Sequence, residues 1–145
     1  MKYVIDTSIL IEIENGNEEI INAISELKKN PFSELYITIF TFCEFYYGAM
    51  EKSPENKEKV KQRLLQYEIL NTSVETASHF CELFSALKKK GRSLPQFDTF
   101  IAAMTIEHQG VLITGDSDFA QIPTLKSIIL PVSVSQRFKR VNARV

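Results

Sequence analysis

The chain has 145 residues, of which 44% are hydrophobic, and its 17 Lys and Arg nearly balance its 18 Asp and Glu, for a formal net charge of −1. This balance excludes a uniformly basic coat for nucleic acid and an acidic disordered tail. No stretch approaches the roughly 20 apolar residues of a membrane span, and Asp6 comes too early for a signal peptide. We expect one cytoplasmic domain over residues 1–145, without a membrane segment.

The few cysteines and histidines are too scattered for a zinc site. Cys43 and Cys81 lie far apart without metal-type spacing, and His79 and His108 are isolated. We therefore expect both thiols to be buried and reduced, and both histidines to be structural.

Short β-prone runs alternate along the chain with segments in which apolar residues recur at helical spacing. In chain order the expected elements are strand 3–5, helix 9–13, helix 18–29, strand 35–39, helix 42–50, a helix opening at 53–55, strand 69–71, a helix following 72–75, helix 96–108, strand 111–114 and strand 127–130. Such alternation favours an α/β sandwich around a mostly parallel sheet of four or five strands.

Polar residues mark several of the expected helix ends. Asn17 and Thr41 are candidate caps, and the run 72–75, Thr-Ser-Val-Glu, fits a capping box. Pro54 suits the first position of a helix. Asn15-Gly16 is expected to end the helix 9–13. These signals predict where the chain turns between elements.

Four acids stand where the carboxyl ends of parallel strands are expected to meet. Asp6 follows the first strand and Asp116 the fourth, while Glu44 and Asp98 lie early in helices next to strands two and four. Two unit charges at 4 Å repel by about 4 kcal/mol at an effective dielectric near 20. A cluster of acids therefore needs protonation or a cation, and an all-oxygen site suits Mg²⁺ or Mn²⁺, which also bind phosphates.

Each acid also has a purely structural interpretation. Asp6 and Asp98 fit helix N-termini, and Glu44 fits a capping pattern with the threonine three positions earlier. Asp116 and Asp118 are residue types common in turns. Spacing alone leaves both interpretations open.

The blocks around these acids resemble the four signature blocks of PIN-domain nucleases. They span residues 6–8, 41–48, 98–103 and 114–119. Their order and the chain length look most like VapC-type toxins of VapBC toxin–antitoxin pairs, and the resemblance covers nearly the whole chain.

The resemblance implies a three-layer αβα sandwich and a Mg²⁺- or Mn²⁺-dependent endoribonuclease, the toxin of a type II toxin–antitoxin system. By block match, the catalytic, metal-binding acids would be Asp6, Glu44, Asp98 and Asp116, with Asp118 a less certain fifth. Such relatives act on RNA, form homodimers and are inhibited by a VapB-type antitoxin.

Other residues would support that site. The resemblance gives the Thr114 hydroxyl an orienting role, and Ser8 stands where many relatives have Asn. A basic run precedes the Asp98 helix and is a candidate to guide RNA phosphates. It consists of Lys88, Lys89, Lys90 and Arg92. The same charges would also complement a helix dipole, which is their structural interpretation. Tyr46 and Tyr47 are candidates to stack on bases or to pack in the core.

Two other functions compete with the ribonuclease. A doubly wound phosphatase or phosphotransferase also places Asp after its first strand. Haloacid-dehalogenase-like enzymes, however, have Asp-x-Asp at this position, whereas residue 8 of this chain is Ser. A non-catalytic interaction module with a PIN-like fold is the other alternative, because a fold does not fix a function.

Overall fold

The computed structural model describes residues 1–132. Within them, five strands form one parallel sheet in the order β3-β2-β1-β4-β5. The strands are β1 (Lys2–Ile5), β2 (Glu34–Thr38), β3 (Glu68–Leu70), β4 (Val111–Thr114) and β5 (Ser127–Ile129). The predicted parallel α/β sheet is confirmed, with five strands.

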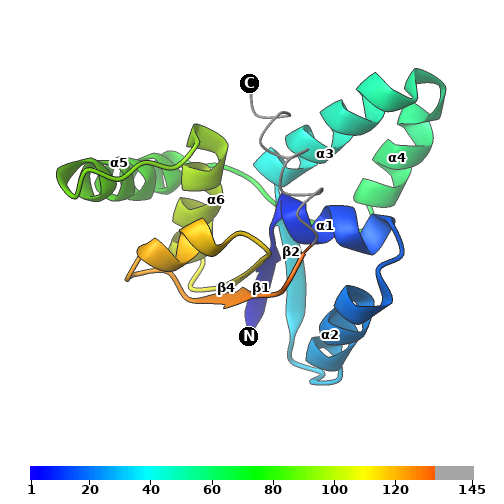
Figure 1. The fold of residues 1–145 in the computed structure, drawn as a ribbon, viewed down its shortest axis with the longest axis horizontal. Helices are drawn as coiled ribbons and strands as arrows, with labels where there is room; N and C mark the ends of the chain where they lie inside the picture. The colour runs from blue at the N-terminus through cyan, green and yellow to red at the C-terminus, as the bar shows by residue number, and fades with distance from the viewer. Residues whose placement is uncertain (133–145) are drawn as a thin grey trace.

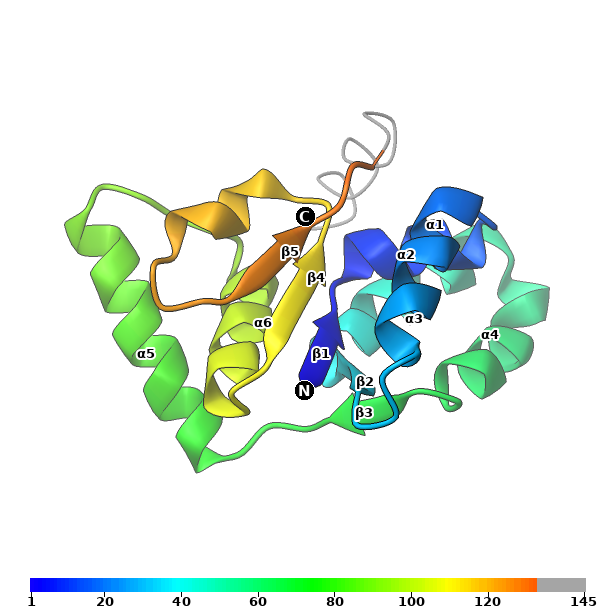
Figure 2. The same cartoon turned by 90° about the horizontal axis from the view of Figure 1, so that it is seen from below.

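Helices cover both faces of this sheet. They are α1 (Thr7–Glu14), α2 (Glu18–Lys28), α3 (Ile39–Lys52), α4 (Lys57–Leu64), α5 (Val74–Lys89) and α6 (Gln96–Glu107), with short 3₁₀ turns η1 (Pro54–Asn56) and η2 (Ser117–Gln121). Helices α5 and α6 lie on one side and α1 to α4 on the other (Figures 1 and 2). The fold is the αβα sandwich expected from the sequence. Across residues 1–132, no helix combines the length and apolar character needed to cross a bilayer.

The two central strands supply side chains to both cores, because successive residues of a strand point to opposite faces. Val4 and Leu112 pack with the α5–α6 layer, whereas Ile5 and Ile113 pack with the other layer. All four are completely buried. Burying each such side chain contributes about 1.5–3 kcal/mol relative to leaving it exposed, so β1 and β4 form a rigid base for whatever follows them.

The chain reverses its direction of winding between β1 and β4. It passes from β1 through β2 to β3 on one side, and then adds β4 and β5 on the other. The Asp6 amide continues the ladder, donating to the Ile113 carbonyl at 2.9 Å. In open parallel sheets, ligands bind beyond the strand ends at such a switch point. Asp6 and the loop after Thr114 lie at this position.

The predicted stop after α1 and the predicted cap of α2 are confirmed, although α1 begins at Thr7 rather than near residue 9. Gly16 ends the turn after α1 with a φ of +77°, a conformation that favours glycine. The Asn17 side chain accepts hydrogen bonds from the Glu19 and Ile20 amides at 3.1 and 3.4 Å, which caps α2.

The predicted cap of α3 is wrong. The helix begins directly after β2, and the Thr38 hydroxyl accepts from the Thr41 amide at 3.1 Å. Thr38 has extended backbone angles, so it is the last strand residue and the cap at once. Strand and helix meet without a loop, and Thr41 lies inside the helix. The capping pattern of Thr41 with Glu44 is therefore absent.

Two further boundaries also differ from expectation. Pro54 opens the 3₁₀ turn η1, and α4 begins only after it. The capping box of α5 joins Ser73 and Thr76, one residue later than predicted. Ser73 adopts the extended backbone that a cap requires, which shifts the pattern by one position.

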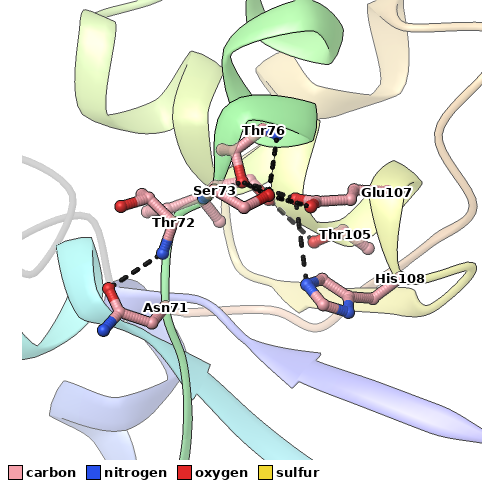
Figure 3. Close-up of polar contacts among 8 residues, drawn as sticks. Asn71, Thr72, Ser73, Thr76, Thr105, Glu107 and His108 are labelled. Carbon is pink, nitrogen blue, oxygen red and sulfur yellow. Dashed lines mark hydrogen bonds and ion pairs between the residues drawn. The ribbon is translucent and has the colours of Figure 1, made fainter.

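This capping box continues into a polar network that joins the start of α5 to the end of α6 (Figure 3). The Ser73 and Thr76 hydroxyls donate to the two carboxylate oxygens of Glu107, at 3.0 and 2.7 Å. His108 lies beside them, with its Nε2 3.8 Å from Glu107 Oε2. The network ties the two helices of one layer together at one end.

We expect Thr76→Val to lower the free energy of unfolding by about 1.5–3 kcal/mol, because it removes a hydrogen bond from a buried hydroxyl to a charged group. Urea unfolding followed by circular dichroism measures the change. Thr72→Val, at an exposed position beside the network, is the control. Equal unfolding free energies for the two variants would show that the network contributes nothing.

The prediction of buried cysteines is wrong. Cys43 on α3 and Cys81 on α5 are free thiols, and both are exposed. Their apolar character did not decide their position, because each lies on a helix face that turns away from the sheet.

Candidate active site

Asp6 is the central residue of the candidate site. Its side chain is completely buried, and its Oδ2 accepts from the Thr114 hydroxyl at 2.6 Å and the Ser8 hydroxyl at 3.0 Å. Asp6 precedes α1 in the cap position, yet its side chain makes no capping hydrogen bond. The carboxylate is therefore oriented by the end of β4, and its simple interpretation as a helix cap is wrong.

The Ser8 and Thr114 hydroxyls extend this arrangement into the loop after β4. Ser8 Oγ accepts from the Gly115 amide at 2.9 Å, and Thr114 Oγ1 accepts from the Asp116 amide at 3.0 Å. A Cβ atom on Gly115 would lie 2.4 Å from Val132, so the close approach requires glycine. The ends of β1 and β4 are thus joined by hydroxyl groups that both donate and accept.

Asp116 caps η2, and Asp118 lies in its first turn. Asp116 Oδ1 accepts from the Asp118 amide at 2.9 Å. This oxygen has the turn-forming role that was one interpretation of Asp116. Asp116 is half-buried, while Asp118 is exposed. Asp116 therefore borders the buried site, and Asp118 lies farther out.

Glu44 reaches the site from α3. Its Oε1 accepts from the Thr7 hydroxyl at 2.7 Å, and Thr7 directly follows Asp6. The Thr7 and Thr41 hydroxyls lie 3.2 Å apart, which fixes α1 against α3. Sequence reasoning missed Thr7, although it lies within the block 6–8. Glu44 therefore does not act in a capping pattern; it joins α3 to α1 through Thr7.

Asp98 lies in the first turn of α6 and is completely buried. Helix α6 leads the chain back to the start of β4, so its own first turn lies at the opposite edge of the sheet, where the strands end. The next residues on the same face, Ile101, Ala102 and Thr105, are also completely buried. A role limited to the helix dipole is typical of exposed positions, whereas a buried carboxylate needs a partner or a cation. Burial therefore favours a specific role for Asp98.

The donor set fits a hard divalent ion in its chemistry. All the predicted acids supply oxygen, and Mg²⁺ typically uses only one or two carboxylates together with waters and substrate phosphates. Among residues 1–132, however, no three Asp, Glu, His or Cys side chains are grouped as ligands of one ion. Hydrogen bonds join Asp6 to the Asp116 loop through Thr114, and Glu44 to Thr7.

Comparison with known proteins identifies the family to which this fold belongs. The model of the PIN domain family matches residues 3–125, which include all five predicted acids. The chain belongs to the PIN domain family.

Individual relatives of this PIN domain are similar over most of their length. Ribonuclease VapC2 of Haemophilus influenzae is 28% identical over 131 residues, covering 88% of this chain and 96% of that protein. The crystal structure of VapBC2 from Rickettsia felis, bound to a DNA fragment from its promoter, matches with a TM-score of 0.80 and 26% identity over 90% of this chain and 99% of that one. VapBC-1 from nontypeable Haemophilus influenzae matches with a TM-score of 0.73 and 27% identity, over 89% and 98%.

The predicted basic run of this PIN domain lies at the end of α5 and in the segment that leads into α6. All four of its cationic side chains are exposed, namely Lys88, Lys89, Lys90 and Arg92. Because α6 begins with Asp98 in its first turn, the run precedes the candidate site by one short loop. Its charges are accessible both to a helix end and to a ligand.

The two tyrosines after Glu44 differ in position. Tyr46 is half-buried and packs on Phe42 with ring centroids 5.9 Å apart, so core packing accounts for it. Tyr47 is 53% exposed. Only the second ring is accessible to a partner.

A pocket of about 500 Å³ opens at the other edge of the sheet, where the strands begin, and none of the predicted acids lines it. Arg63 Nε pairs with Glu14 Oε2 at 3.0 Å there. Burial, with a smaller contribution from the Glu14 carboxylate, raises the pKa of the Tyr67 hydroxyl above its usual value. The pocket is therefore separate from the candidate active site.

Proposed function

We propose that residues 1–145 form one PIN nuclease domain, a Mg²⁺- or Mn²⁺-dependent endoribonuclease that is the toxin of a VapBC-type pair. The observation that carries this proposal is the buried Asp6, held by two hydroxyls at the sheet's switch point. The relatives named ribonuclease VapC support the substrate and the reaction. The exposed free thiols are typical of a reducing compartment such as the cytoplasm.

The proposed ligands of the ion are Asp6, Asp98 and Asp116, with Glu44 completing the set or orienting water and Asp118 at the rim. A divalent ion, when bound, lowers the pKa of water and polarises the scissile phosphate. The chain's own contribution is orientation: Thr114 and Ser8 hold Asp6 from one side, and Thr7 holds Glu44. Such outer partners fix ligand geometry in metal sites. The basic run would attract the RNA backbone toward these acids.

The experiment that tests this proposal is incubation of the purified protein with total RNA, in buffer with Mn²⁺ and in buffer with EDTA. We expect fragments only with the ion. A parallel assay with p-nitrophenyl phosphate tests the phosphatase alternative, and a calorimetric titration with Mn²⁺ tests the non-catalytic module. Phosphatase activity without RNA cleavage, or absence of ion binding near neutral pH, would overturn the proposal in favour of the corresponding alternative.

The proposed partner is a VapB-type antitoxin, supported by similar structures described as VapBC complexes. An Arg or Lys of such a partner would pair with the carboxylates of this site. Co-expression with the product of a neighbouring small open reading frame is expected to abolish RNA cleavage. Unchanged cleavage in the co-purified complex would contradict this role.

Thr114→Val tests the orienting hydroxyl without changing the shape of the strand. The variant loses the hydrogen bonds to Asp6 and from Asp116, so we expect Mn²⁺-dependent cleavage to fall about 10–100-fold, as for outer partners of metal ligands. Initial rates on one defined RNA measure the effect. Thr114→Ser, which keeps the hydroxyl, should retain most of the activity. If the Val and Ser variants are equally active, the hydroxyl has no orienting role.

A further inference from the structure

Five phenylalanine rings from three helices form one continuous column. Phe40 of α3 stacks on Phe100 of α6 with centroids 4.5 Å apart, and Phe100 stacks on Phe80 of α5 at 4.0 Å. Phe97 extends the column at one end, 5.1 Å from Phe40, and Phe84 at the other, 5.6 Å from Phe80. Both end rings are 41% exposed, whereas the inner three are half-buried. The column therefore reaches solvent at each end.

One end of the column lies next to an acid of the candidate site along α6. Phe97 directly precedes the buried Asp98 in the first turn of α6. The ring that it contacts, Phe40, lies four residues before Glu44 on α3 and so shares a helix face with it. Phe84 lies on α5 at the other end of the column, separated from Phe97 by the three inner rings. Two chemically identical, equally exposed rings thus lie at opposite ends of the column, and one of them directly precedes an acid of the candidate site.

An exposed aromatic ring at this position offers RNA an attractive contact that carboxylates cannot provide. Carboxylates repel a phosphate backbone, whereas the face of an aromatic ring attracts any unpaired base whatever the charge nearby. Phe97 is already held against Phe40, with 59° between the ring planes, so little side-chain freedom remains to be lost on binding. The exposed basic run, which ends five residues before Phe97 at Arg92, would attract the adjoining phosphates.

We propose that Phe97 is a positioning residue on which an unpaired base of the RNA stacks, so that the neighbouring phosphate is held at the carboxylates. This inference rests on the proposed ribonuclease function and adds one contact to it. The stacking partner is an RNA base, and a second copy of the chain is the occupant that the test must exclude.

The absence of tryptophan from the chain allows a direct test. Phe97→Trp introduces a single reporter whose fluorescence is quenched when a base stacks on it. In EDTA, where the RNA stays intact, a short oligoadenylate is expected to quench this variant saturably. Phe84→Trp, with matched exposure at the far end of the column, should change little. Equal quenching of both variants, or of neither, would overturn the proposal.

Two controls identify what covers the ring. An abasic ribose-phosphate oligomer should leave the Phe97→Trp emission unchanged, because it has no base to stack. Quenching by this oligomer would assign the signal to phosphate binding and contradict the proposal. A change of emission on concentrating the protein without RNA would show that another copy covers the ring, and would also contradict it.

Kinetics provide a second readout that does not depend on the tryptophan variants. Loss of one stacked base is expected to raise KM for a defined RNA by about tenfold in Phe97→Ala, with kcat little changed. Phe97→Tyr should restore KM, and Phe97→Leu, which is apolar but has no ring, should not. Restoration by Leu would assign the ring a packing role. Thermal melts of each variant report on folding.

Failure of this inference is distinguishable from failure of the proposed function. If the wild-type protein cleaves RNA with Mn²⁺ while oligoadenylate leaves the Phe97→Trp fluorescence unchanged, only the stacking contact is wrong. If oligoadenylate quenches the emission but no ion supports cleavage, the ribonuclease proposal is wrong.

Discussion

Asp98→Asn and Asp6→Asn are each expected to reduce Mn²⁺-dependent RNA cleavage by at least about a hundredfold. Loss of an outer partner of a metal site already costs 10–100-fold, and these changes remove the charge of proposed ligands. Both side chains are completely buried and keep their shape as Asn, so the fold should persist. Initial rates on one defined RNA, over a range of Mn²⁺ concentrations, measure the loss.

The matched control is Glu82→Gln, which removes one negative charge from an exposed position on α5. It should leave the rate within about twofold, because exposed charges contribute little beyond a Debye length of roughly 10 Å. Thermal melts of all three variants separate loss of chemistry from loss of folding. Full activity in both Asp variants would rule out the assignment of the acids.

Phe119→Ala is expected to have the largest effect on stability, about 3–5 kcal/mol, as for aromatic side chains removed from a core. Phe119 is completely buried in the core between the sheet and the α5–α6 layer. Domains are typically stable by about 5–15 kcal/mol, so the variant would lose a large part of its stability. Because Phe119 anchors η2, which begins after Asp116, we also expect activity to fall.

Urea unfolding followed by circular dichroism measures this loss. Phe84→Ala, which truncates a 41% exposed ring, is the control and should cost clearly less. If both variants unfold at the same urea concentration, Phe119 does not hold η2 against the sheet as its burial indicates.

The order of elements could be predicted because each of them has a strong periodic signal. The strand 111–114 is found with the predicted bounds, since β-branched and apolar residues lie between Gly110 and Gly115. The errors in helix bounds lie at helix starts, where Thr38 acts as the cap in place of Thr41 and Ser73 in place of Thr72. Each of these starts holds more than one hydroxyl residue within a few positions, and only the backbone conformation selects the one that caps.

The candidate site was predictable as far as strand ends determine it. Asp6 and Thr114 follow or end adjacent strands, so a parallel sheet brings them together, and their hydrogen bond follows from that register. The contact of Thr7 with Glu44 and the column ending at Phe97 depend on how three helices cross. Helix crossing leaves no regular spacing in the sequence, so these contacts could not be predicted from it.

The formal charge of −1 now has a physical interpretation. The buried Asp6 lies at the switch point of the sheet, while the basic run at 88–92 is exposed at the end of α5 and in the segment that follows. A chain that is neutral on average can therefore offer RNA both an attractive approach and a site that needs a cation. Charge averages exclude classes of protein, but they do not exclude such a local division.

The chemical nature of the cleaved ends tests the central claim most directly. Hydrolysis by an activated water breaks the bond from phosphorus to O3′ and leaves a 5′-phosphate and a 3′-hydroxyl. Attack by the RNA's own 2′-hydroxyl, which needs no divalent ion, leaves a 2′,3′-cyclic phosphate and a 5′-hydroxyl. Mapping the ends of a defined RNA after incubation with Mn²⁺ should give 5′-phosphates for the wild-type chain and no cuts for Asp98→Asn. Cyclic phosphate ends, or equal cutting by both proteins, would contradict a metal-dependent acid site.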